Sequence, residues 1–164
     1  MHGMDYSGQD VSGWIAQEKL DGLRALWTGK ELVSREGKRF NAPAWFLEGL
    51  PNIPLDGELY AGPGTLSTLS TRLARWKSGK DADWMGVAFR IFDLPSVNGG
   101  YPWRVSVALD TKFASTVPYR RVSGIKEAIQ MRDAIQACGG EGVVLRHPSA
   151  PYIAGRTDTL LKLK

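Results

Sequence analysis

The stretch EKLDGLR at residues 18–24 has a lysine before and an arginine after an Asp-Gly pair. It joins two short apolar segments, residues 14–19 and 23–28, that have the length and composition of β-strands around an Asp-Gly turn. A third such segment follows at residues 31–35, so the sequence predicts a β-meander. A nucleophilic lysine must be held rigidly and must lose its proton, and Lys19 at the end of a strand is a candidate. An ordinary surface lysine in a turn would give the same short string.

The rest of the chain alternates short strands with a few helices. Apolar runs or alternation predict strands at residues 55–60, 87–93, 143–146 and 160–164. Apolar side chains recur every three or four residues at 65–76 and 125–138, which predicts two helices, the second ending at Gly139 and Gly140. Strands outnumber helices and the early ones are linked by tight turns. The predicted fold class is therefore α+β, with mainly antiparallel β-sheets and flanking helices.

Length and composition predict one globular domain spanning residues 1–164. The chain is 43% hydrophobic, which excludes disorder, and it lacks the glycine period of collagen. It contains no run of about 18 apolar residues, so no membrane span is expected. The single Cys138 excludes an internal disulfide framework. The first residues are polar and Gly-rich, so no secretory leader is expected, although a leader removed by processing would give the same sequence.

Two stretches carry charges of one sign only. Between Glu58 and Asp81 every charged residue is basic, and the same holds between Asp110 and Glu127. With a net charge of +4, these stretches suggest a polyanionic partner. A solvated helix face and a solvated loop are the alternative explanation for each stretch.

Five further segments follow Lys19 in a fixed order. They are residues 34–37 (SREG), 55–60 (LDGELY), 89–93 (FRIFD), 141–146 (EGVVLR) and 161–164 (LKLK). With these segments in this order, the sequence resembles the covalent nucleotidyltransferases, the superfamily of ATP-dependent DNA ligases, RNA ligases and mRNA capping enzymes. The DNA ligase branch is most similar, in particular the small bacterial and phage ATP-dependent ligases. That similarity includes residues 11–14 (VSGW), 42–46 (APAWF) and 92–95 (FDLP).

The resemblance implies an ATP-grasp-like nucleotidyltransferase fold and a covalent mechanism. In such enzymes the lysine that corresponds to Lys19 attacks the α-phosphorus of ATP and becomes a lysyl-AMP phosphoramidate. AMP then passes to the 5′-phosphate of nicked double-stranded DNA, and the 3′-hydroxyl displaces it to seal the strand, in DNA repair, replication and recombination. Only 18 residues precede Lys19, so ATP is expected rather than NAD, whose ligases carry an additional N-terminal domain.

Site residues follow from the resemblance, with some support from general chemistry. Lys162 and Lys164, alternate residues of one predicted strand, are expected to neutralise the α-phosphate oxygens. The resemblance implies that Glu141 assists Mg²⁺ binding. It further implies that Phe92 stacks on adenine, that Glu58 accepts a hydrogen bond from the ribose, and that Glu18 lies beside the adenine edge. Arg24 and Arg35 are implied to contact the ribose and later the nick phosphate. An acid inside an apolar strand, as at Glu58, also needs a partner on physical grounds.

The two basic stretches are expected to contact DNA phosphates. The residues expected to do so are Arg72, Arg75, Lys77, Arg120 and Arg121. Family members continue into an OB-fold domain after the last motif, and no such domain is expected within these 164 residues. A monomer that acts in the cytoplasm without a membrane is expected, and the periplasm stays open if a leader is removed.

Two other functions remain open at this point. The same chemistry would serve an RNA ligase or an mRNA-capping-type nucleotidyltransferase. A non-catalytic nucleic-acid-binding module could also keep the fold, although the presence of Lys19, Glu58, Glu141, Lys162 and Lys164 together argues against it.

Overall fold

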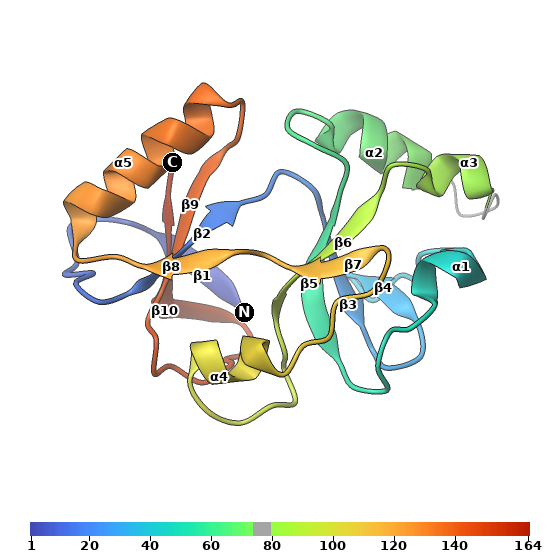
Figure 1. Cartoon of the computed structure of the whole chain (residues 1–164), viewed down its shortest axis with the longest axis horizontal. Coiled ribbons are helices and arrows are strands. Elements are labelled where there is room, and N and C mark those ends of the chain that lie inside the picture. Colours follow the sequence, from blue (N-terminus) through green and yellow to red (C-terminus); the bar gives the residue numbers. More distant parts are fainter. Residues whose placement is uncertain (74–79) are drawn as a thin grey trace. The chain divides into compact units, whose positions relative to one another are not determined.

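The computed structural model describes residues 1–73 and 80–164, and the chain divides into two compact units. The first unit contains Met1–Leu20, Val97–Ser106 and Val117–Lys164, and the second contains Asp21–Ser96 and Val107–Thr116. Each unit is built on one five-stranded sheet (Figure 1). Six of the described strand pairings are antiparallel and two are parallel. The predicted α+β class with mainly antiparallel sheets is therefore confirmed.

The first unit has the strand order β1-β10-β9-β2-β8. Its elements are β1 (His2–Asp5), β2 (Ile15–Lys19), α4 (Tyr101–Ser106), β8 (Tyr119–Arg121), α5 (Ile125–Ala137), β9 (Gly142–Arg146) and β10 (Arg156–Leu163). Helix α5 lies along β9 and β2 (Figure 1). Its Ala128 packs in a buried cluster with Ala16, Val143 and Leu161 of the sheet. One face of this sheet is thus covered by α5, and side chains at alternate positions point to the other face.

The second unit has the strand order β4-β3-β5-β6-β7. Its elements are β3 (Leu23–Trp27), β4 (Leu32–Ser34), α1 (Ala44–Leu47), β5 (Leu55–Tyr60), α2 (Leu66–Leu73), α3 (Asp81–Trp84), β6 (Ala88–Asp93) and β7 (Ala114–Thr116). Its core contains the fully buried Leu59, Leu69 and Phe89. Phe46 of α1 packs on Trp84 of α3 with ring centroids 4.7 Å apart. The alternation along β5 and β6 leaves polar side chains on the opposite face of the sheet.

The predicted meander at the start of the chain is wrong in one respect. β3 and β4 pair as an antiparallel hairpin, but β2 pairs with β8 and β9 and belongs to the other sheet. The Asp21-Gly22 segment therefore carries the chain from one unit to the other instead of closing a hairpin. Gly22 is required there, because a Cβ at this position would lie 2.4 Å from the carbonyl oxygen of Leu59.

Both predicted helices are present within the described residues. α5 spans nearly the whole predicted range, whereas α2 begins at Leu66 and residues 74–76 of the prediction lie outside the described residues. None of the helices in the described part of the chain combines the length and the apolar character needed to cross a bilayer.

Candidate active site

Lys19 lies at the end of β2, an inner strand of the first unit's sheet. It is the last residue of β2 and lies opposite Gly142, the first residue of β9. A Cβ on Gly142 would lie 2.4 Å from the carbonyl oxygen of Leu163, so only glycine lets β10 approach this closely. The strand ends around Gly142 thus bring three separate segments of sequence to one place.

A carboxylate flanked by two lysines is the result. Glu141 accepts a hydrogen bond from Lys19 Nζ at one carboxylate oxygen, Oε2, and from Lys164 Nζ at the other, Oε1, at 2.6 Å. The side chains of Lys19 and Glu141 are 20% and 25% exposed, whereas that of Lys164 is 58% exposed. Partial burial favours the neutral form of Glu141, but the hydrogen bonds from Lys164 and Lys19 outweigh it and hold its pKa below the ordinary value. Glu141 is therefore an anion that bridges the two predicted site lysines.

Lys162 shares the face of Lys19 but has a different partner. Its strand neighbours Leu161 and Leu163 belong to the core cluster beneath α5, so Lys162 lies on the other face of the sheet. Lys162 Nζ forms an ion pair of 3.2 Å with Asp5 Oδ1 of β1. Asp5 had no role in the sequence prediction, and no pattern in the polar N-terminal segment pointed to it.

Glu18 points to the side of the sheet that faces α5. Its neighbour Ala16 lies in the core cluster, and a Cβ on Gly140 would lie 3.2 Å from Glu18 Oε1. The carboxylate is thus next to the turn that follows α5, whereas Lys19 lies on the opposite face.

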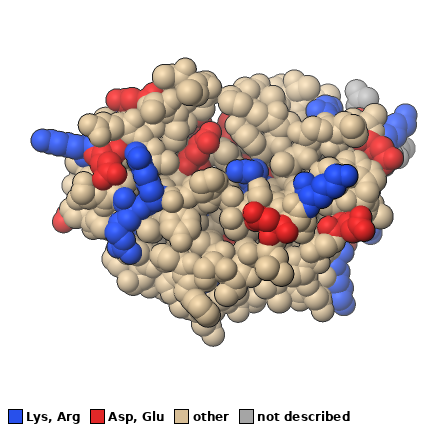
Figure 2. All heavy atoms as spheres, viewed as in Figure 1, with Lys and Arg blue, Asp and Glu red and all other residues tan. Residues whose placement is uncertain are grey.

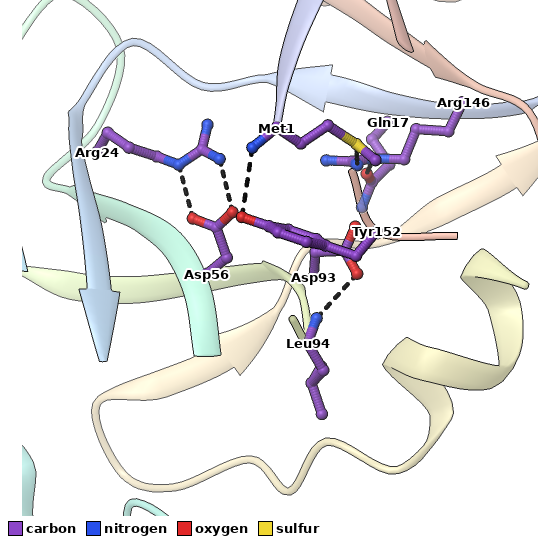
Figure 3. Close-up of polar contacts among 8 residues, drawn as sticks. All are labelled: Met1, Gln17, Arg24, Asp56, Asp93, Leu94, Arg146 and Tyr152. Carbon is purple, nitrogen blue, oxygen red and sulfur yellow. Dashed lines mark hydrogen bonds and ion pairs between the residues drawn. The ribbon is translucent and has the colours of Figure 1, made fainter. Parts of the chain in front are cut away.

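In the second unit, Arg24 is held by an acid that the sequence analysis did not select. Arg24 Nε and Nη2 each donate to one oxygen of Asp56, both at 2.6 Å, as Figure 3 shows. The side chain of Asp56 is only 3% exposed, so this bidentate pair is shielded from water on its acidic side. The guanidinium carbon of Arg24 also lies 4.4 Å from the ring centroid of Phe92. A buried acid next to Gly57 in an apolar strand was the signal that could have identified Asp56.

Glu58 and Arg35 occupy different surroundings. Glu58 lies on β5 directly between Arg24 of β3 and Arg90 of β6 in the strand register. Arg35 lies in the exposed turn that follows β4, and it makes no hydrogen bond or ion pair with any other described residue. The structure thus brings Arg24, Asp56, Glu58 and Phe92 together on one sheet and leaves Arg35 outside their contacts.

The residues predicted to contact DNA fall into three situations. Arg72 Nη2 donates to the carbonyl oxygens of Asp83 at 2.7 Å and Met85 at 2.8 Å, which ties the end of α2 to the turn after α3. Arg75 and Lys77 lie outside the described residues. Arg120 and Arg121 are exposed on the edge strand β8, where Figure 2 shows a group of basic side chains, and Arg121 Nη1 also donates to the carbonyl oxygen of Gly13 at 2.7 Å.

Buried hydrogen bonds of Gln17 also support β2, the strand that carries Lys19. Gln17, two residues before Lys19 on β2, accepts a hydrogen bond from Arg146 Nε at 3.0 Å and donates to the carbonyl oxygen of Val117 at 3.2 Å. Arg146 Nη1 also contacts the sulfur of Met1 (Figure 3). Strand β2 is therefore anchored by side chains as well as by its backbone ladder.

The comparisons with known proteins agree on one family. A DNA ligase from Haemophilus influenzae is 33% identical over 165 residues, which cover 97% of this chain and 60% of that protein. The chain thus spans about 60% of the length of this curated relative. No protein-family model matches the chain.

Solved structures of DNA ligases share the fold. A structure from a study of Lig E DNA ligases superposes with a TM-score of 0.87 at 28% identity and covers all of this chain and 69% of the other. Chlorella virus DNA ligase-adenylate superposes at 0.79 with 20% identity, covering 99% of this chain and 66% of the other. The ATP-dependent DNA ligase of bacteriophage T7 in complex with ATP superposes at 0.74 with 15% identity, covering 99% and 67%.

These relatives are DNA ligases, which favours the DNA ligase branch over RNA ligases and capping enzymes. The chain carries Lys19, Glu141 and Lys164 in one cluster and matches these ligases along nearly its whole length. By sequence and by fold it is therefore similar to DNA ligases.

Proposed function

We propose that residues 1–164 form a single nucleotidyltransferase domain that transfers AMP from ATP to Lys19 and then to nicked double-stranded DNA. The observation that carries this proposal is the cluster of Lys19, Glu141 and Lys164 at the end of β2. A lysine that is mostly buried and bound to a carboxylate is held in one position, as covalent catalysis requires.

The first step uses the nitrogen of Lys19 as the nucleophile. The ammonium of Lys19 loses a proton to water, and the free amine forms the N–P bond to the α-phosphorus while the bond to the bridging oxygen breaks and pyrophosphate leaves. A second proton then passes from the new P–N nitrogen to water, which gives the neutral phosphoramidate nitrogen. Glu141 accepts the hydrogen bond of Lys19 before the reaction and so fixes where Nζ lies. Lys164, and Lys162 once it leaves Asp5, supply positive charge for the phosphate oxygens. In-line displacement at phosphorus depends mainly on such positioning and charge neutralisation.

The described side chains supply only part of a ligand shell for Mg²⁺. Among the described residues there is no cluster of three or more His, Cys, Asp or Glu side chains that could hold a metal. A single carboxylate such as Glu141 is nevertheless enough when phosphate oxygens and water complete the shell, as is common for Mg²⁺. Bound there, Mg²⁺ would screen the charge of the triphosphate. Glu141 would then exchange its contacts with the two lysines for the metal.

We assign the nucleoside to residues of the second unit. Phe92 offers a half-exposed ring for the adenine, and Glu58 offers an acceptor for a ribose hydroxyl. The bidentate contact with Asp56 orients the guanidinium of Arg24 for its proposed contacts with the ribose and, later, the nick phosphate. These roles rest on the family resemblance together with the positions of the residues on β3, β5 and β6.

Sealing a nick requires contacts beyond this site. We propose that the exposed Arg120 and Arg121 contact DNA phosphates, which would give binding that falls with salt and depends little on sequence. An OB-fold domain, as in family members, would assist the later steps. The protein is proposed to act as a monomer in the cytoplasm, consistent with a single cysteine that needs no oxidising compartment.

Intact mass spectrometry tests the first step directly. The protein is incubated with ATP and Mg²⁺, beside a Lys19→Ala variant and a GTP control. A gain of roughly 329 Da, one AMP, is expected only for the parent protein with ATP. Subsequent loss of this adduct on nicked DNA, and not on intact duplex, would identify the acceptor. A parent protein that starts without AMP and gains no mass, even with an OB-fold domain supplied in trans, would contradict the proposal.

A further inference from the structure

The face of the second unit's sheet that points away from its core carries a row of charged and polar side chains. In the strand register, Arg24 of β3 lies opposite Glu58 of β5, Glu58 opposite Arg90 of β6, and Arg90 opposite Ser115 of β7. The neighbours of Arg90 on β6, Phe89 and Ile91, are fully buried on the core side. Arg90 is half-buried and therefore faces the same side as Glu58.

Arg90 is held in place but keeps unused donors. Its Nη1 donates to the hydroxyl of Ser115 at 2.7 Å. That is the one hydrogen bond or ion pair of its side chain within the described part of the chain. A guanidinium has five N–H donors, so most of those on Arg90 are available to a ligand. Ser115 thus holds the head group from the side of β7, while Glu58 lies directly opposite on β5, where Cβ atoms of opposed residues are about 5 Å apart.

We propose that Arg90 is a specificity-determining residue that recognises the ribose of the bound nucleotide together with Glu58. This inference rests on the proposed function, because Glu58 is the ribose acceptor there. A ribose presents two neighbouring hydroxyl groups, each of which both donates and accepts. Glu58 accepts from one hydroxyl, and Arg90 donates to the oxygen of the other. A fixed acceptor beside a fixed donor matches this vicinal diol, whereas two acceptors or two donors would match it less well.

The spacing of Arg90 and Phe92 along β6 also fits this role. Phe92, the proposed adenine platform, is two residues further along β6 and is likewise half-exposed, next to buried neighbours. The base and the sugar of one nucleotide would thus lie along β6 in order. The resemblance assigns a role to Phe92 in the segment FRIFD (residues 89–93) and none to Arg90.

Titration calorimetry with three ligands tests the inference without requiring turnover. Parent and variants are made in a Lys19→Ala background so that the nucleotide is not consumed, and ATP, 2′-deoxy-ATP and 3′-deoxy-ATP are compared. The parent is expected to bind ATP about tenfold or more tightly than either analogue, because each lost hydroxyl removes a hydrogen bond to a charged group. Arg90→Met should abolish the preference against one analogue and keep it against the other. Glu58→Gln should do the reverse, and Arg90→Lys should restore part of the lost preference.

An exposed arginine of the same unit provides the control. Arg39, whose side chain is 69% exposed, lies outside the row, and Arg39→Met should leave both preferences unchanged. If Arg90→Met keeps both preferences, or weakens all three ligands equally, Arg90 does not recognise the ribose. If discrimination depends on Arg90 but the protein that keeps Lys19 gains no AMP in the mass-spectrometry test, the proposed function is overturned and this inference stands. A parent that binds none of the three ligands would overturn both.

Discussion

Replacing Glu141 with glutamine removes one negative charge while keeping the size of the side chain, and it separates the stability of the cluster from its activity. In the parent, Glu141 is bound to Lys19 and Lys164, and all three side chains are partly exposed. Ion pairs of this kind contribute about 0.2–1 kcal/mol each. The Glu141→Gln variant should therefore lose about 1 kcal/mol of unfolding free energy at neutral pH. For a chain of this length that corresponds to a decrease of about 2–4 °C in melting temperature.

The pH dependence of this loss has a defined sign. The pKa of Glu141 is lower in the folded protein than its ordinary value of 4.5. A carboxylate of this kind stabilises the fold fully above 4.5, and the contribution disappears as the pH falls through the folded pKa. The difference between parent and variant should be constant near neutral pH and should vanish in acid. Thermal unfolding of both proteins, followed by circular dichroism at about five pH values from about 3 to 7, measures this difference in stability.

The activity should respond far more strongly than the stability. Without the charge, Lys19 and Lys164 lose the anion between them and Mg²⁺ loses its proposed ligand. We expect lysyl-AMP formation to slow by about 100-fold or more, equivalent to about 2.7 kcal/mol of activation free energy. Glu127→Gln, on the exposed start of α5, is the matched control and should leave the rate unchanged. If Glu141→Gln forms lysyl-AMP within about threefold of the parent rate, the proposed role of Glu141 is refuted.

Three further substitutions test the supporting structure. Asp56→Ala leaves the guanidinium of Arg24 without its bidentate acceptor and should destabilise the protein by about 3 kcal/mol in urea denaturation; no change would show that the pair does not form. Arg72→Met should lower stability by about 1–3 kcal/mol while binding to nicked DNA stays intact, and weaker DNA binding by a fully folded variant would instead favour a phosphate contact. Gly22→Ala places a Cβ 2.4 Å from the carbonyl oxygen of Leu59 and should lower the unfolding free energy by about 1–3 kcal/mol. An unchanged melting temperature would contradict this expectation.

Local patterns in the sequence located most of the strands but not their partners. Strands predicted at residues 55–60 and 87–93 are present as β5 and β6. β2 and β3 have the local signature of a hairpin, yet β2 lies between β8 and β9, which come from much later in the chain. Pairing over such a separation depends on packing of the whole sheet and leaves no mark in a short window. β8 itself was missed because its three residues are all exposed and show no alternation.

The residues of the candidate site that belong to sequence motifs could be predicted, whereas their partners from other segments could not. The motifs predict Lys19, Glu141 and Lys164 as site residues, and the three side chains meet in the structure. The pairing of Lys162 with Asp5 was not predictable, because it arises from the parallel contact of β1 with β10 at opposite ends of the chain. The role of Arg72 could not be read from composition either, since a charge in sequence does not reveal the carbonyl groups that will surround it.

The order in which the strands leave the ribosome has a consequence for biosynthesis. Every strand of the second unit lies between residues 23 and 116, so this unit can acquire its sheet while translation continues. β2 emerges before all of them, but its neighbours β8 and β9 are made of residues 119–121 and 142–146, and β10 follows at 156–163. Until those segments appear, the strand that carries Lys19 has two unsatisfied edges and is exposed to mispairing. Protection of the nascent chain from protease should therefore appear first in the second unit. Lys19 should become ordered only when β8, β9 and β10 have been synthesised.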